Sequence, residues 1–147
     1  MVVMSVVATA AMAVALRTTQ TTLTVTDRRD VFADGRFALD EMSKDLRQGE
    51  SIDATSDADT VKVPSYIDGT AATIVWRAAG SAAPYVLQRS TDGGTSFVSV
   101  MDSLATSDIF VYTSHEGVRD QVTIALSVTT STTTVDLTTD VNLRNAD

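Results

Sequence analysis

The stretch from Phe32 to Leu46, FADGRFALDEMSKDL, decides how this 147-residue chain is expected to fold. Within it, Phe32, Leu39, Met42 and Leu46 follow one another at steps of seven, three and four residues. Such steps return to the same side of an α-helix, which turns once in about 3.6 residues. The stretch therefore predicts an amphipathic helix that packs on the rest of the protein through these four apolar side chains.

The helix is expected to reach far upstream, because residues 2–34 contain neither glycine nor proline. Downstream, Gly49 is placed to end it in a left-handed C-cap conformation. The simplest prediction is one long N-terminal helix over residues 1–48. Its first part, residues 1–16, would lie in a membrane or a filament core, and residues 27–48 would pack on the head.

The first sixteen residues, MVVMSVVATAAMAVAL, contain no charged side chain, and Arg17 is the first charge. Three interpretations compete: a secretory signal peptide cleaved near Ala13, a buried helix of a soluble protein, or a membrane helix. A signal peptide normally begins with basic residues, which are missing here. A complete membrane span needs about 20 apolar residues, so we expect its upstream end to precede Met1. The residues expected to form this membrane or filament-core helix are Val2, Val3, Val6, Val7, Ala11, Val14 and Leu16.

Residues 49–147 are expected to form a β-rich globular head. Residues 122–129 and 135–144 alternate between apolar and polar side chains, which is typical of antiparallel strands with one buried face. A tight turn is predicted at Asp92-Gly93-Gly94. The expected fold class is α+β, a long N-terminal helix, apolar then amphipathic, packed on an antiparallel β-sheet. Shorter strands are predicted at 61–63 (ending at Pro64), 73–77, 85–89, 96–100 and 109–112.

Composition excludes several classes of function. The net charge of -8 argues against binding of nucleic acid, which depends on lysine and arginine. The chain contains no cysteine, so it has neither disulfides nor a thiolate metal site. No nucleic-acid partner is expected.

Few residues suggest catalysis or ligand binding. His115 is the only histidine, and its neighbour Ser114 is adjacent only in sequence, which is no indication of catalytic geometry. Asp53, Asp57 and Asp59 share a loop whose spacing fits no EF-hand. We interpret them as solvated loop charges, with a weak calcium site as the alternative. No catalytic, cofactor-binding or metal-ligating residue is predicted, and the protein is expected not to be an enzyme.

Two segments carry a resemblance to a known family. The stretch RFALDEMSKDLRQ (Arg36–Gln48) resembles the end of the helix in type IV pilin-like proteins, closest to J-type minor pseudopilins and minor pilins. The stretch TTDVNLRN (Thr138–Asn145) is similar to the closing strand of the same proteins. The Gly-Phe-Thr-x-x-Glu segment at which that family's leader is cleaved does not occur in this chain.

The resemblance implies a structural subunit of a type IV pilus or a type II secretion-like filament. Its N-terminal helix would sit in the inner membrane before assembly, as a single-pass anchor with an extracytoplasmic head. The subunit would then join a surface or periplasmic filament. Its partners would be other pilin-like subunits, contacted through the helix and the head. The alternative is a secreted β-rich binding module released by signal-peptide cleavage.

Overall fold

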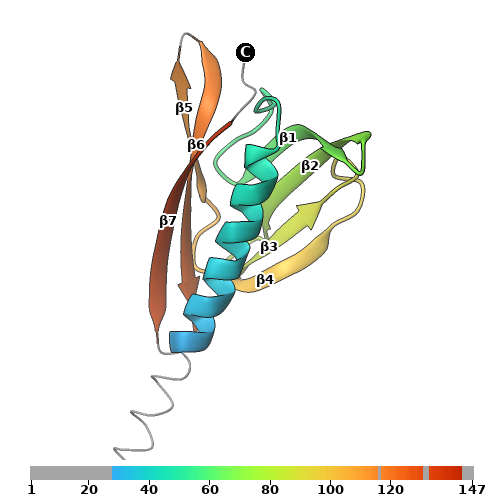
Figure 1. Cartoon of the computed structure of the whole chain (residues 1–147). Helices are drawn as coiled ribbons and strands as arrows, with labels where there is room; N and C mark the ends of the chain where they lie inside the picture. Colours follow the sequence, from blue (N-terminus) through green and yellow to red (C-terminus); the bar gives the residue numbers. More distant parts are fainter. Residues whose placement is uncertain (1–27, 116, 131–132, 144–147) are drawn as a thin grey trace, which may run out of the picture.

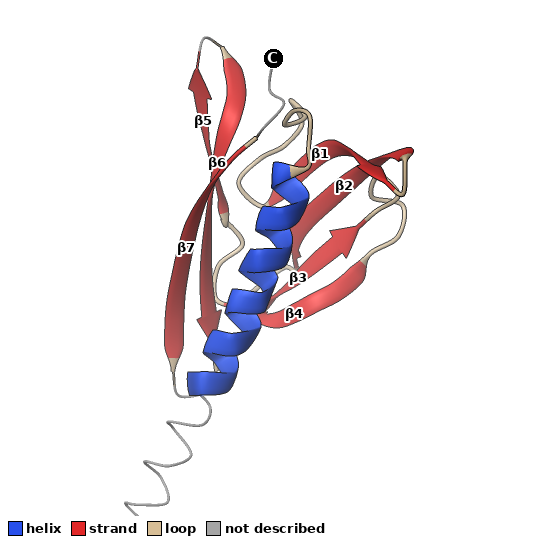
Figure 2. Cartoon of the chain, in the orientation of Figure 1, coloured by secondary structure: helices blue, strands red, loops and turns tan. Residues whose placement is uncertain are grey.

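The computed structural model describes residues 28–115, 117–130 and 133–143. One helix covers residues 28–47, and seven strands follow it in a single antiparallel sheet (Figures 1 and 2). The strands are β1 (Thr60–Ile67), β2 (Thr70–Ala79), β3 (Tyr85–Ser90), β4 (Val98–Leu104), β5 (Phe110–His115), β6 (Val118–Thr129) and β7 (Thr134–Asn142).

The predicted α+β fold class, with a long helix lying on a sheet, is wrong. The described protein is mostly antiparallel β, with one short helix and a sheet that curls into a nearly closed, barrel-like form. The long helix was predicted from the lack of glycine and proline, but that lack permits a helix without specifying one. Alternating side chains likewise show which strand face is dry and do not show how far a sheet curls.

The upstream part of the predicted helix lies outside the described residues. In the part of the chain that is described, no helix has the length and apolar character needed to cross a bilayer. The predicted membrane or filament-core residues that lie outside the described ranges are Val2, Val3, Val6, Val7, Ala11, Val14 and Leu16.

The sheet has two parts, which are joined through strands β4 and β6. Strands β1 to β4 form an antiparallel meander, and β6 pairs with β5 and with β7. The two parts are joined where Leu104 of β4 pairs with Val128 of β6. In Figure 1 the helix crosses in front of the sheet, with β5 to β7 on one side and β1 to β4 on the other.

A second contact brings the ends of the sheet together. The backbone amides of Ile109 and Phe110 both donate to the carbonyl oxygen of Ala58, at 2.8 and 2.9 Å. The hydroxyl of Tyr112 on β5 lies 2.9 Å from the carbonyl oxygen of Asp57 and 3.0 Å from that of Thr60. Burial raises the pKa of this hydroxyl. The start of β1 and the start of β5 are therefore hydrogen-bonded to each other.

The helix buries one face in the sheet. Leu39, Met42 and Leu46 all lie in the core, where Met42 is fully buried. The prediction that Phe32 belongs to this face is wrong, since its side chain is 41% exposed. Val31 is buried instead of Phe32. Residues 31, 35, 38, 42 and 46 lie on the buried side of the helix, and Phe32 is turned away from that side because each residue rotates the helix by about 100°.

Pro64 lies inside β1, although the sequence predicted that the strand ends there. Its carbonyl oxygen accepts a hydrogen bond from the amide of Glu50 at 3.1 Å, on the side of β1 away from β2. The nitrogen of a strand residue points to the same side as its carbonyl oxygen. The missing N–H of Pro64 therefore removes no hydrogen bond to β2, which is how an edge strand accommodates proline.

Gly49 ends the helix for a different reason from the one predicted. Its amide donates to the carbonyl oxygen of Leu46 at 3.1 Å, but its φ is not in the left-handed region. A Cβ atom at Gly49 would lie 1.8 Å from Cγ1 of Val63 on β1. Glycine is needed because the chain passes directly against the sheet.

Candidate functional site

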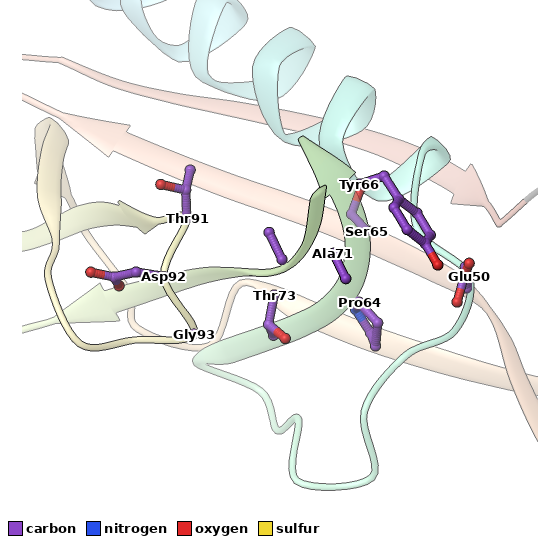
Figure 3. Close-up of a pocket in the computed structure, with 10 residues that line it drawn as sticks. Glu50, Pro64, Ser65, Tyr66, Ala71, Thr73, Thr91, Asp92 and Gly93 are labelled. Atoms are coloured by element: carbon purple, nitrogen blue, oxygen red, sulfur yellow. The ribbon is translucent and has the colours of Figure 1, made fainter. Parts of the chain in front are cut away.

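A shallow pocket of about 440 Å³ lies between the β1–β2 hairpin and the turn after β3 (Figure 3). Its rim carries the carboxylates of Glu50 and Asp92 and the ring of Tyr66. Ser65 also lines it, and the buried Ser65 hydroxyl has no hydrogen-bond partner among the described residues. The residues that line the pocket carry carboxylates and hydroxyls, and none of them is a lysine, arginine or histidine.

The three loop aspartates bond mainly to their own loop. Asp53 Oδ1 accepts hydrogen bonds from the amide and the hydroxyl of Thr55, at 2.8 and 2.7 Å, which lowers the pKa of Asp53. Asp57 Oδ1 accepts from the amide of Thr60, and a hydrogen bond with Asp59 raises the pKa of Asp57. Among the described residues, no cluster of three or more His, Cys, Asp or Glu side chains is placed to hold a metal ion.

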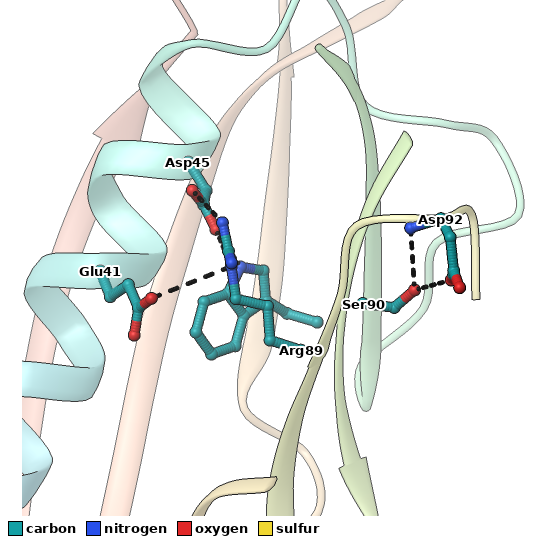
Figure 4. A network of polar contacts seen from close by, with 6 residues as sticks. Glu41, Asp45, Arg89, Ser90 and Asp92 are labelled. Carbon is teal, nitrogen blue, oxygen red and sulfur yellow. Dashed lines mark hydrogen bonds and ion pairs between the residues drawn. The ribbon is translucent and has the colours of Figure 1, made fainter. Parts of the chain in front are cut away.

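The turn at Asp92 is closed by its own side chains (Figure 4). Ser90 Oγ donates to Asp92 Oδ1 at 2.6 Å, and the amides of Thr95 and Ser96 donate to the same oxygen at 3.0 and 2.9 Å. These bonds, the one from Ser90 first, hold the pKa of Asp92 well below its usual range. Gly93 and Gly94 have φ of 75° and 94°, which glycine adopts without strain.

A buried carboxylate fixes the helix to the sheet. Asp45 is only 5% exposed, although it is charged and lies on the helix (Figure 4). Its Oδ2 accepts a hydrogen bond from Nε1 of Trp76 at 2.9 Å and from Nε of Arg89 at 2.8 Å. Nη2 of Arg89 donates to Oδ1 at 3.1 Å, so the guanidinium binds both carboxylate oxygens.

Arg89 is held between two acidic side chains of the helix. Its Nε also lies 4.0 Å from Glu41, one turn before Asp45. The hydrogen bond to Asp45 is the main cause that raises the pKa of Arg89, so this side chain keeps its charge. We call Glu41, Asp45, Trp76 and Arg89 the Asp45 network. Its role is to hold the helix on β2 and β3.

Sequence reasoning missed most of this network. The predicted strands 73–77 and 85–89 contain Trp76 and Arg89, but no contact with the helix was predicted for either residue, and Asp45 was not singled out. One signal was present: Asp45 lies seven residues after Ala38 and three after Met42, in the buried register of the helix. A charge in that register requires a partner, because an unpaired buried charge is costly.

The outward part of the helix borders a groove along β4. Two adjoining depressions of about 370 and 180 Å³ share Phe37 and Val100. Phe37 is 65% exposed and Val98 is 71% exposed, so large apolar side chains face solvent here. Asp34 and Asp102 line the same groove. We call Asp34, Phe37, Val98, Val100 and Asp102 the helix groove.

The sequence also drew attention to the neighbours Ser114 and His115. Ser114 and His115 lie at the end of β5, in the hairpin that leads to β6. Comparison of the chain with protein-family models, with curated proteins and with solved structures found no match. Because Phe37 and Val98 expose large apolar side chains there, we take the outward side of the helix together with the helix groove as the candidate functional surface.

Proposed function

We propose that the protein is a non-enzymatic structural subunit of a membrane-anchored, extracytoplasmic filament of the type IV pilus or type II secretion kind, in the role of a minor pilin or pseudopilin. One observation carries the proposal. The helix of residues 28–47 is fixed to the head by one face and leaves Phe37 exposed on the other side. This helix follows closely after an uncharged segment, residues 1–16.

The Asp45 network supports a role for the helix in transmitting force. Asp45 receives three hydrogen bonds from two strands, β2 and β3. Leu46, beside it, is 1% exposed and packs in the same core. A force applied to the chain before residue 28 would therefore reach the whole sheet through the helix. A filament subunit whose head hangs on its N-terminal segment needs such a connection.

The composition of residues 1–16 supports the attachment. The segment has no charged residue and contains several alanines. Apolar side chains partition into lipid, and small ones allow helices to approach closely, both in a bilayer and in a packed filament core. In this proposal the segment holds the subunit in the inner membrane before assembly. It then contacts other pilin-like subunits in the filament.

Membrane fractionation of the full chain tests the proposal. We expect the protein to stay with the inner membrane after washes in high salt and alkaline carbonate, and to be released by detergent. The variant Val7→Lys, which places a charge in the uncharged segment, should reduce this retention strongly. Val111→Lys is the matched control, since Val111 is an exposed residue of β5, and it should leave retention unchanged.

A soluble extracytoplasmic product would overturn the proposal. N-terminal sequencing of such a product distinguishes the alternative directly. A new N-terminus shortly after Ala13 or Ala15 would identify a secreted β-rich binding module released by signal-peptide cleavage.

A further inference from the structure

The charges of the helix are sorted onto two flanks. Residues 1–47 contain six basic and six acidic side chains, so the whole net charge of -8 arises from residues 48–147. Yet the helix itself is not electrically uniform. At about 100° per residue, all of its exposed basic side chains except Arg28 fall within roughly a quarter of its circumference. We call them the basic stripe: Arg29, Arg36, Lys44 and Arg47.

The basic stripe lies on the β7 side of the outward face. Arg36 lines a depression together with Leu137 and Thr138 of β7. Lys44 and Arg47 line a second depression together with Thr139 of β7. One acidic residue, Asp40, interrupts the stripe. The stripe therefore keeps a clear excess of positive charge on one flank of an otherwise acidic protein.

The basic stripe has no ion-pair partner in the described part of the chain. The ion pairs found there are those that Arg89 makes with Glu41 and Asp45. Arg36 lies over the ring of Phe32, with its guanidinium carbon 5.8 Å from the ring centre, and it is otherwise open to solvent. These cations are thus available to an acidic surface outside the subunit.

The helix groove, on the opposite flank of the helix, carries negative charge that is complementary to the positive charge of the basic stripe. Asp34 and Asp102 are exposed at one end of it, and Glu41 lies at the other. The basic side chain that lines the groove, Arg89, is already bound to Asp45. Between the carboxylates lie the exposed side chains of Phe37 and Val98. The groove therefore suits a cationic segment that also buries apolar surface.

We propose that a second copy of this chain places its basic stripe in the helix groove. The two surfaces lie on opposite flanks of the same helix. Each subunit can therefore bind one neighbour through its helix groove and another neighbour through its basic stripe. A contact between two different surfaces does not close on itself in a dimer and can propagate as a filament. The inference rests on the proposed filament role, and it adds the contact that joins neighbouring subunits.

Disulfide cross-linking of full-length chains tests this contact, because the native chain has no cysteine. Ala33→Cys marks the basic stripe, and Ser99→Cys marks the helix groove; both positions are exposed. The two variants, carrying different tags, are mixed in detergent micelles and oxidised. We expect a mixed disulfide dimer, formed several-fold less at about 500 mM than at about 50 mM salt, because salt screens exposed charges. Thr113→Cys, exposed on β5, is the control partner for Ala33→Cys.

Charge reversal checks that electrostatics drives the contact. Arg36→Glu with Arg47→Glu in the stripe copy should reduce the mixed dimer at least several-fold, and so should Asp34→Lys with Asp102→Lys in the groove copy. Combining both reversed copies should restore it. All four residues are exposed, so circular dichroism should show folded protein throughout.

Two results would overturn the inference. One is a yield from Ala33→Cys and Ser99→Cys no higher than the yield with Thr113→Cys. The other is a cross-link that charge reversal leaves unchanged. Membrane fractionation of the same samples separates this inference from the proposed function. Retention without the cross-link overturns the docking contact alone, and a cross-link without retention overturns the membrane-anchored filament role.

Discussion

The two halves of the helix are attached to the sheet by different means. In the C-terminal half, Asp45 is bound by Trp76 and Arg89, and just after the helix ends Gly49 lies directly against Val63. In the N-terminal half, the close contact is Gly35, where a Cβ would lie 2.6 Å from Cδ1 of Leu137. The far end of a leucine can move, whereas a buried ion pair and a β-branched side chain have little freedom. The helix is thus held most specifically at the end that leads into the sheet.

This difference predicts the largest effect at Asp45. Replacing Asp45 by alanine leaves the buried N–H of Trp76 without its acceptor and Arg89 without its main partner. We expect the free energy of unfolding to fall by about 3 kcal/mol, because both groups lose a charge-assisted hydrogen bond. Urea denaturation of the two proteins measures the loss.

Asp45→Asn is the matched variant, since its amide oxygen can still accept from Trp76. It should lose less stability than Asp45→Ala. Equal losses would show that the hydrogen bond to Trp76 contributes nothing measurable, and a loss below about 1 kcal/mol for Asp45→Ala would contradict the proposed attachment.

A smaller but clear effect is expected at Gly49. In Gly49→Ala the new methyl group would overlap Cγ1 of Val63, which is 1% exposed and cannot swing into solvent. Overpacking of this kind costs about 1–3 kcal/mol. Thermal or urea unfolding of Gly49→Ala gives the value.

A double-mutant cycle identifies the cause of the Gly49 effect. If the overlap with Val63 is responsible, Gly49→Ala should cost much less in a Val63→Ala background. Additive losses would instead point to a backbone requirement at Gly49.

The smallest effect is expected at Gly35, the corresponding contact of the N-terminal half. Alanine in a helix interior gains about 1 kcal/mol over glycine, and this gain offsets the displacement of the Leu137 methyl group. We expect the free energy of unfolding of Gly35→Ala to stay within about 1 kcal/mol of the native value. A loss of stability as large as that of Gly49→Ala would contradict the inference that the N-terminal half of the helix is held less specifically than its C-terminal end.

The local patterns of the sequence located much of the secondary structure. The spacing of apolar residues placed Leu39, Met42 and Leu46 on one helical side, and these residues are buried. Alternation placed strands near those observed as β6 and β7. The same spacing misassigned Phe32, because Val31 and Phe32 are both apolar and only the packed sheet distinguishes them.

The candidate surface was harder to predict from sequence. Asp45 is separated from Trp76 by 31 residues and from Arg89 by 44, so no local pattern links them. The helix groove depends on β4 lying beside Phe37, which is again a long-range arrangement. The prediction that β1 ends at Pro64 was wrong. The sequence does not show that the position of the missing N–H faces away from β2, and only the strand pairing reveals this.

By itself, the sequence determined the features that arise from short-range chemistry. The 3.6-residue period favours a helix, the two-residue period favours strands, and the net charge and the lack of cysteine restrict partners and cross-links. The tertiary structure alone decided how far the sheet curls, which helical residue opens the buried series, and which buried charge meets which partner. These features depend on contacts between distant segments, and such contacts become defined only when the whole core packs together.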